Sequence, residues 1–424
     1  MYNEIAKQLI EFIEKSPTCF HAVQTMSDIL LDEGFTELRE NEKWKIEKGG
    51  KYFVTRNGSS LIAFTIPEQR MKGMRIMASH SDSPSFKIKE NPEMETEGHY
   101  IRLNVEKYGG MLCAPWFDRP LSVAGRVIVR DSESGALCTV LVNVDRDLVM
   151  IPNLAIHMNR EVNDGYKYNA QKDMLPLYGD IAAKDSFMGM IADAAGTVPD
   201  AILGHDLFLY NRQRASIWGA SDEFLSASRL DDLQCAFSSL KGFLAGEKKE
   251  YMAVHCVLDN EEVGSGTKQG AASTFLYDTL TRAHESLGLT REDYLIHLAD
   301  SFMVSADNAH AVHPNYPEKM DPVNRTYLNG GIVLKFNANQ KYCTDGVSAA
   351  MFRDICRKAG VPVQTFTNRS DMAGGSTLGN ISNTQVALNT ADIGLPQLAM
   401  HSPYETVGVK DTEYLIRAAE VLFC

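Results

Sequence analysis

The sequence predicts an α/β fold that is interrupted by a β-rich insertion. From about residue 222 onward, segments with helical periodicity alternate with short apolar runs, which is the pattern of an α/β domain. Residues 91–220 instead carry strand-like runs separated by Gly, Asp and Pro turns. We therefore expect residues 1–90 and 221–424 to form one discontinuous domain, and residues 91–220 to form the inserted one.

The first ninety residues predict two helices followed by short strands. Ile5, Leu9 and Ile13 recur at helical spacing and indicate an amphipathic first helix. A second helical stretch covers residues 21–33. Strand-like runs follow at 52–54, 61–64 and 74–78.

The remaining elements are expected on both sides of residue 220. Within the insertion we expect strands at 100–105, 121–129 and 136–144. Downstream, apolar runs predict strands at 252–258, 295–298, 332–336 and 398–400. Helices are expected at 230–244, 271–287 and 346–360. The last of these ends on Gly360, a residue suited to a helix C-cap.

The composition indicates a soluble cytoplasmic protein. The chain has 424 residues, a formal net charge of −13 and 44% hydrophobic residues, as in globular proteins with more than one packed core. This acidic balance repels phosphate backbones and anionic membranes, so neither nucleic acid nor a membrane is an expected partner. The start of the chain lacks the features of a secretory signal, and no apolar run is long enough to span a membrane. The eight cysteines are scattered singly, which favours reduced thiols.

Side chains that can bind metals follow several of the predicted strands. His80 and Asp82 come directly after the run at 74–78, and their spacing lets Asp82 orient the ring of His80. Glu261 and Glu262 come after the run at 252–258. Two adjacent carboxylates project in different directions, so one can bind metal while the other handles protons.

Three further segments place acidic or imidazole side chains at comparable positions. Asp307 follows an apolar stretch, His401 follows the run at 398–400, and Asp231 begins the helix expected at 230–244. Each candidate also has an ordinary explanation, namely a structural loop histidine, a solvated acidic turn or a helix cap. Five such segments together favour a metal site, because ligands collect beyond the carboxyl ends of strands in an open α/β sheet. Carboxylates outnumber imidazoles and thiols are absent, which suits two divalent ions, zinc with manganese or cobalt as alternatives.

Read as motifs, the same segments match one family. They are Ser-His-Ser-Asp-Ser-Pro from residue 79, Arg-Leu-Asp from 229, Asp-Asn-Glu-Glu-Val-Gly-Ser from 259, Ser-Ala-Asp-Asn-Ala-His-Ala-Val-His-Pro from 305 and Leu-Ala-Met-His-Ser from 398. With these motifs the chain resembles the aspartyl aminopeptidases, which are M18-type two-metal aminopeptidases. Segments of the insertion, at 108–110, 116–119 and 151–160, extend the likeness to nearly the whole chain.

The resemblance implies a role for each candidate ligand. Asp231 would bridge two metal ions, His80 and Asp307 would complete the ligands of one ion, and Glu262 and His401 those of the other. The implied fold is a mixed-sheet, zinc-aminopeptidase-like catalytic domain with an inserted β-rich dimerisation domain.

The resemblance also implies residues that act on the substrate. Glu261 would be the general base. His157 resembles the residue that a neighbouring subunit presents to the active site within a dodecamer. Lys335 resembles the lysine that faces the side chain of the first substrate residue, where an ammonium would favour Asp or Glu; a surface lysine is the alternative. One departure is visible, since the family's usual Leu-Asp-Asn reads Leu-Asp-Asp here, with Asp232 in the third position.

The sequence therefore predicts a metal-dependent aminopeptidase that removes the amino-terminal residue of peptides. Two alternatives remain at this point. One is a two-metal hydrolase of N-acyl amino acids, which would share the ligands but differ in the pocket. The other is a non-catalytic assembly protein, against which the presence of Glu261 argues because that residue is not needed as a ligand.

Overall fold

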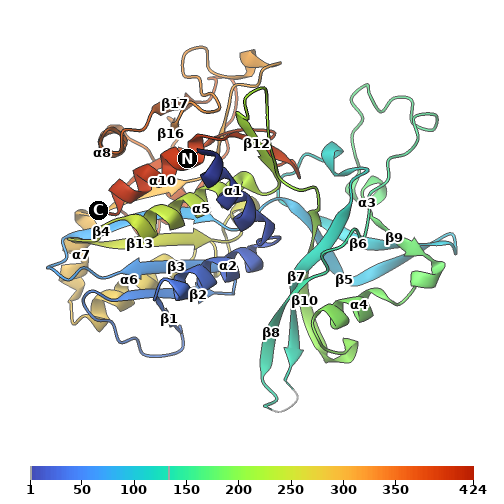
Figure 1. Cartoon of the computed structure of the whole chain (residues 1–424), viewed down its shortest axis with the longest axis horizontal. Coiled ribbons are helices and arrows are strands. Elements are labelled where there is room, and N and C mark those ends of the chain that lie inside the picture. The colour runs from blue at the N-terminus through green and yellow to red at the C-terminus, as the bar shows by residue number, and fades with distance from the viewer. Residues whose placement is uncertain (1, 132–133) are drawn as a thin grey trace. The chain divides into compact units, whose positions relative to one another are not determined.

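The computed structural model describes residues 2–131 and 134–424, which divide into two compact units (Figure 1). The first unit comprises Met1–Asp82, Ala215–Met400 and Glu405–Cys424, and the second comprises Ser83–Arg214 and His401–Tyr404. The short segment 401–404 therefore belongs with the second unit, although the chain on both sides of it belongs with the first.

A nine-stranded mixed sheet forms the centre of the first unit, with the order β1-β2-β3-β13-β4-β14-β18-β16-β17. Its strands are β1 Thr36–Leu38, β2 Lys51–Arg56, β3 Ser60–Thr65, β4 Gly73–His80, β13 Tyr251–Leu258, β14 Phe302–Ala306, β16 Ile332–Phe336, β17 Val363–Thr367 and β18 Asn389–Gly394. Strands β13, β4, β14 and β18 are parallel neighbours, and β3 and β16 flank them in the antiparallel direction. The central strands β4, β13 and β14 are almost entirely buried, as expected for a parallel sheet covered on both faces.

Two layers of helices supply that cover. Side chains from α1 Tyr2–Glu14, α2 Cys19–Asp32, α5 Leu230–Ala245, α8 Gly346–Ala359 and α10 Asp411–Leu422 share one apolar core. Those from α6 Phe275–Ser286, α7 Arg291–Ala299 and α9 Leu378–Ser382 share another. Successive residues of β13 alternate between the two cores, with Ala253 in the first and Val254 in the second. No helix in the described part of the chain combines the length and the apolar character needed to cross a bilayer.

A smaller sheet of five strands completes the first unit, with the order β11-β12-β20-β19-β15. Its strands are β11 Ser216–Trp218, β12 Phe224–Ala227, β20 Glu405–Gly408, β19 Pro396–Leu398 and β15 Ala309–His310. The short 3-10 helices of this unit are Glu261–Val263 and Pro317–Lys319. Because β15 begins two residues after Asp307, this sheet continues directly from the end of β14.

The second unit is built on an antiparallel sheet of six strands, with the order β8-β7-β10-β5-β6-β9. Its elements are β5 Ser85–Thr96, β6 Tyr100–Tyr108, β7 Leu121–Arg130, β8 Leu137–Asn143, α3 Ala170–Asp173, β9 Leu177–Asp180, α4 Phe187–Ala194 and β10 Ile202–Asn211. Three 3-10 helices lie at Ala114–Trp116, Ile181–Ala183 and Pro199–Ala201. The unit has its own apolar core, in which Phe86 packs edge-on against Trp116.

The strand predicted at 295–298 is wrong, and of the strand predicted at 398–400 only Leu398 lies in a strand, β19. Residues 295–298 lie inside helix α7, and the strand that leads to Asp307 is β14. The helix begins at a capping box, in which Thr290 accepts the backbone N–H of Asp293 at 3.2 Å and Asp293 accepts the backbone N–H of Thr290 at 2.8 Å. Leu295 and Ile296 are exposed, so their apolar character does not mark a core strand.

Candidate active site

The candidate ligands of the first unit meet because the central strands are parallel. Strand β4 ends at His80, and β13, its parallel neighbour, ends at Leu258 just before the turn that carries Glu261 and Glu262. Strand β14 runs parallel to β4 on its other side and leads into Asp307. The carboxyl ends of all three strands therefore supply functional groups to one edge of the sheet.

Helix α5 brings Asp231 and Asp232 to the same edge. Both residues have non-helical backbone angles, so they precede the regular part of the helix. Arg229 adopts the left-handed conformation with φ of 59° and donates from Nε to the carbonyl of Ser16 at 3.0 Å. The backbone N–H of Asp231 donates to Glu405 Oε2 at 3.0 Å. These contacts hold the start of α5 in an irregular shape that points two carboxylates into the site.

His80 lies at the centre of the cluster. Its Nε2 atom is 3.4 Å from Asp231 Oδ1 and 3.8 Å from Asp307 Oδ1. Its Nδ1 atom is 3.0 Å from the backbone carbonyl of Asp82. A proton on Nδ1 donates to that carbonyl and leaves the lone pair of Nε2 to a metal.

Within the first unit, two groups of ligand atoms are compact enough to hold an ion. In the first, His80, Asp231, Asp232 and Asp307 each offer an atom within 4.8 Å of all the others. In the second, the same is true of His80, Glu261 and Glu262. Zinc binds imidazole nitrogen and carboxylate oxygen at about 2.0–2.2 Å, which places its donors within this separation. The residues present therefore fit divalent zinc.

Asp82 holds the turn that carries the two glutamates. Its Oδ1 accepts the backbone N–H of Glu261 at 3.1 Å, and its Oδ2 accepts that of Glu262 at 3.2 Å. Its carbonyl contact with His80 joins this turn to the imidazole. The sequence predicted that Asp82 contacts His80, but it did not predict the hydrogen bonds of Asp82 to the turn at Glu261 and Glu262.

Burial and crowding of carboxylates shift the pKa of several groups in the cluster. Burial raises the pKa of Glu261 to about 8; His80 opposes the rise, and Asp307 and Asp231 add to it. Burial likewise raises the pKa of Glu262 and of Asp232 well above the usual range. Burial alone would lower the pKa of His80, but hydrogen bonds with Asp231, Asp307 and Asp82 raise it well above its usual value. Positive charge in the cluster would relieve this repulsion.

Lys335 brings an ammonium to one side of the cluster. The residue is buried in β16, and its Nζ donates to the carbonyl of Asn308 at 2.9 Å and lies 3.6 Å from Asp307 Oδ2. Burial would lower the pKa of Lys335, but the charges of Asp307, Tyr342, Asp392 and Cys235 together outweigh this effect and raise it. The ring centre of Tyr342 lies 5.4 Å from the ammonium. Lys335 is thus a buried cation next to a candidate ligand, not a surface lysine.

The other two predicted site residues lie in the second unit. The ring of His401 makes a hydrogen bond through Nδ1 with the carbonyl of Gly110. His157 lies exposed in the segment between β8 and β9. Their predicted roles remain predictions.

Sequence reasoning missed Asn308 as part of the support of the site. Its amide Nδ2 donates to the carbonyl of Leu230 at 3.1 Å and to Gln234 Oε1 at 3.1 Å, so it ties the segment after β14 to the start of α5. It also contacts Gln397. The only available signal was its place next to Asp307.

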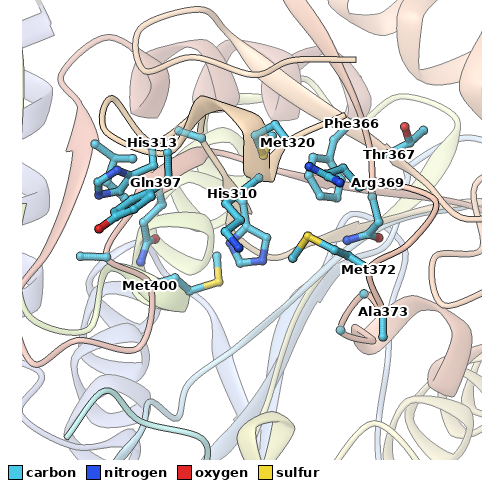
Figure 2. A pocket seen from close by; sticks show the side chains of 18 residues that line it. His310, His313, Met320, Phe366, Thr367, Arg369, Met372, Ala373, Gln397 and Met400 are labelled. Carbon is cyan, nitrogen blue, oxygen red and sulfur yellow. The ribbon is translucent and has the colours of Figure 1, made fainter. Parts of the chain in front are cut away.

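A cavity of about 320 Å³ lies in the first unit beyond Asp307 (Figure 2). His310 stands at its centre in the view, with Met320, Met372 and Met400 around it. Phe366 also lines the wall, and no acidic side chain is among the lining residues. The cavity lies between the end of β15 and the segment before His401.

Comparison with known proteins identifies the family. A family model described as "Aminopeptidase I zinc metalloprotease (M18)" matches residues 12–423. The chain belongs to the M18 family. An M18 protein of Clostridium acetobutylicum, described as "Probable M18 family aminopeptidase 2", is 48% identical over 99% of this chain and 98% of its own length.

Solved M18 structures share the fold throughout. The chain is similar to a structure described as the Ape4 and Nbr1 complex, with a TM-score of 0.95, 36% identity and coverage of 100% of this chain and 86% of the other. The structure of mApe1 of Chaetomium thermophilum has a TM-score of 0.90 and 30% identity, and the match covers 100% of this chain and 98% of the other. The structure of the mApe1 dodecamer of S. cerevesiae has a TM-score of 0.88 and 28% identity, and the match covers 100% of this chain and 97% of the other.

Membership of the M18 family confirms the predicted family, fold class and activity. The chain is a metal-dependent aminopeptidase of the zinc type. This finding favours the aminopeptidase interpretation over the N-acyl amino acid hydrolase and the non-catalytic assembly protein.

Proposed function

We propose that this M18 aminopeptidase works with two metal ions, and that the carboxylate of Asp231 would help to hold both of them. His80 and Asp307 would hold one ion, and Glu262 and His401 the other. The ligand set of the first unit is supported by two groups of side chains that both include His80. In each group, every member offers a ligand atom within 4.8 Å of those of the others. The assignment of His401 rests on its motif.

Glu261 is the proposed general base. Bound divalent ions lower the pKa of water and polarise the scissile carbonyl, which is the chemistry that metals supply in such sites. Glu261 would take a proton from the attacking water and later pass it to the leaving amine. Asp82 supports this role because it holds the backbone N–H of Glu261.

The substrate preference is proposed to be acidic. A buried ammonium attracts a carboxylate side chain, and Lys335 is such a group next to Asp307. Its existing hydrogen bond to the carbonyl of Asn308 leaves two further N–H groups for a substrate.

We also propose self-association into a homo-oligomer, and a dodecamer in particular, in the cytoplasm. Support comes from the solved mApe1 dodecamer, which this chain resembles over its whole length. In this proposal the β-rich second unit is the dimerisation domain, and His157 reaches the active site of a neighbouring subunit. Mass measurement in solution, combined with the activity of His157→Ala, tests both parts.

One experiment tests the two-metal mechanism. Purified protein is assayed on Asp-Ala and Leu-Ala before and after chelation, with zinc, manganese or cobalt added back, alongside Glu261→Gln and Glu262→Gln. We expect Glu261→Gln to keep two ions per chain and lose about 10²–10⁴-fold in kcat, the range for a general base. Glu262→Gln should lose one ion. A single ion per active wild-type chain would contradict the proposal.

A further inference from the structure

The carboxylate of Asp232 is buried in the metal cluster and only partly used by the fold. The residue is fully buried, and its Oδ2 accepts the backbone N–H of His80 at 3.1 Å. Its Oδ1 is shielded from solvent and has no hydrogen-bond partner among the residues that the structure describes. The thiol of Cys235 donates to Asn308 Oδ1 at 3.2 Å and also interacts with the carboxyl group of Asp232. The Oδ1 atom of Asp232 is therefore available as a further ligand beside the other candidate ligands.

Asp232 shares the imidazole of His80, a nearby group that can carry positive charge, with Asp231, Asp307 and Asp82. None of the Lys or Arg ion pairs found in the described ranges involves Asp232, and Lys335 is placed against Asp307. A buried carboxylate without its own cation is strongly unfavourable unless it takes up a proton or a metal compensates it. Its oxygen lies within 4.8 Å of ligand atoms on His80, Asp231 and Asp307, so the compensating charge belongs in this cluster.

The fold itself does not need a charge at this position. An Asn side chain would offer the same acceptor to the backbone N–H of His80. Asp411 shows what a purely structural carboxylate looks like in this chain. It is also fully buried, yet its two oxygens accept the backbone N–H groups of Asn329 and Gly331 at 2.7 and 3.0 Å, remote from the cluster.

We propose that Asp232 is an additional oxygen donor to the ion held by His80 and Asp307, and that it biases this position toward oxygen-preferring ions such as manganese. This inference rests on the proposed metal site. With Asp232 included, one imidazole and three carboxylates surround the ion. Carboxylate oxygen suits manganese, whereas imidazole nitrogen favours zinc, so removing one carboxylate changes the balance between them.

The test compares the metal-free wild type with Asp232→Asn and with Asp411→Asn as a matched buried control. Affinities for Zn²⁺ and Mn²⁺ are measured by competition with a chromophoric chelator, and bound metal is counted by elemental analysis. We expect Asp232→Asn to weaken Mn²⁺ binding by about tenfold or more, the scale of support effects at metal sites, and Zn²⁺ binding by less. Asp411→Asn should leave the ratio of the two affinities unchanged.

The thermal stability of the metal-free proteins separates a metal role from a structural one. We expect the Tm of metal-free Asp232→Asn to equal or exceed that of the wild type, because a repelling carboxylate has been removed, while its rise on adding Mn²⁺ is smaller. An unchanged ratio of affinities, or a variant that is destabilised or unfolded without metal, would overturn the inference. A wild type that binds no ion would instead refute the proposed metal site.

Discussion

Asp82 accepts the backbone N–H of Glu261 at 3.1 Å, so the group that lies next to His80 also positions the proposed base. Through these contacts, Asp82 links the position of the proposed metal ligand His80 to that of the proposed base Glu261. A shift of the turn would move Glu261 relative to His80, and misplacement by about 1 Å is enough to cost about 10²-fold in rate.

Asp82→Asn should therefore lower kcat by about 10–100-fold, the range seen when the support of a metal ligand is removed. An amide cannot accept both backbone N–H groups of the turn, because one of its ends is a donor. Steady-state kinetics and metal content are the measurements. Asp321→Asn is the control, since Asp321 caps an exposed turn by accepting the N–H of Val323 and Asn324. If Asp82→Asn kept the wild-type kcat, the turn at Glu261 and Glu262 would not depend on Asp82 for its position.

Lys335→Met should change the substrate preference. We expect kcat/KM for Asp-p-nitroanilide to fall by about 10–150-fold, because a charge-assisted hydrogen bond contributes about 1.5–3 kcal/mol. The value for Leu-p-nitroanilide should change by about threefold or less, within the scatter of an uncharged contact. Equal losses on both substrates would mean that Lys335 acts by supporting Asp307. Leu as the best substrate of the wild type would contradict the acidic preference itself.

The stability of the metal-free protein should fall as the pH rises from 5 to 7. Burial raises the pKa of Asp411 to about 7, against the lowering effect of its backbone hydrogen bonds. A folded-state pKa above the unfolded value near 3.9 means that the folded chain binds the proton more tightly, so its contribution is full at low pH and is lost as the pH approaches 7. The slope attributable to one such group is at most about 1.4 kcal/mol per pH unit.

Asp411→Asn tests the source of this slope. The variant removes the titrating group, so its unfolding free energy should vary less with pH than that of the wild type. Urea unfolding at pH 5, 6 and 7 in the presence of a chelator measures both. Glu261, whose pKa is raised to about 8, titrates later and contributes with the same sign. Parallel pH profiles for the two proteins would exclude Asp411 as a source.

Thr290→Ala should destabilise the protein by about 1 kcal/mol, the usual cost of losing an N-cap. Thr290 and Asp293 form the capping box of α7. Thr290→Ser keeps the hydroxyl and serves as the matched control, with little expected change. Chemical unfolding measures both variants. A loss equal to that of Thr290→Ala in the Ser variant would point to the lost methyl group instead.

The sequence was sufficient to bring four candidate ligands of the first unit and the proposed base together. His80, Asp307 and the two glutamates follow strands that are buried and parallel, and the ends of such strands must meet. Asp231 joined them through its motif. These predictions depend on strand type and order along the chain, which apolar runs reveal.

Contacts between segments that are far apart in the chain could not be predicted from the sequence. The backbone N–H of Asp231 bonds Glu405, and Asn308 bonds Leu230, yet no spacing in the sequence relates these residues. The strand predicted at 295–298 failed for a different reason. Four apolar letters fit a helix or a strand equally well, and the Thr-x-x-Asp pattern at residue 290 was the better signal.

The ligands of the first unit come from strands that are far apart along the chain, and this spacing has a consequence for biosynthesis. His80 leaves the ribosome early, whereas Asp307 and the strand β14 that carries it are made much later. Until then the sheet lacks the neighbour that completes the cluster beside β4. If the proposed metal site is right, a nascent chain that has not yet reached Asp307 lacks one of its ligands, so peptidase activity is expected only after this segment is made.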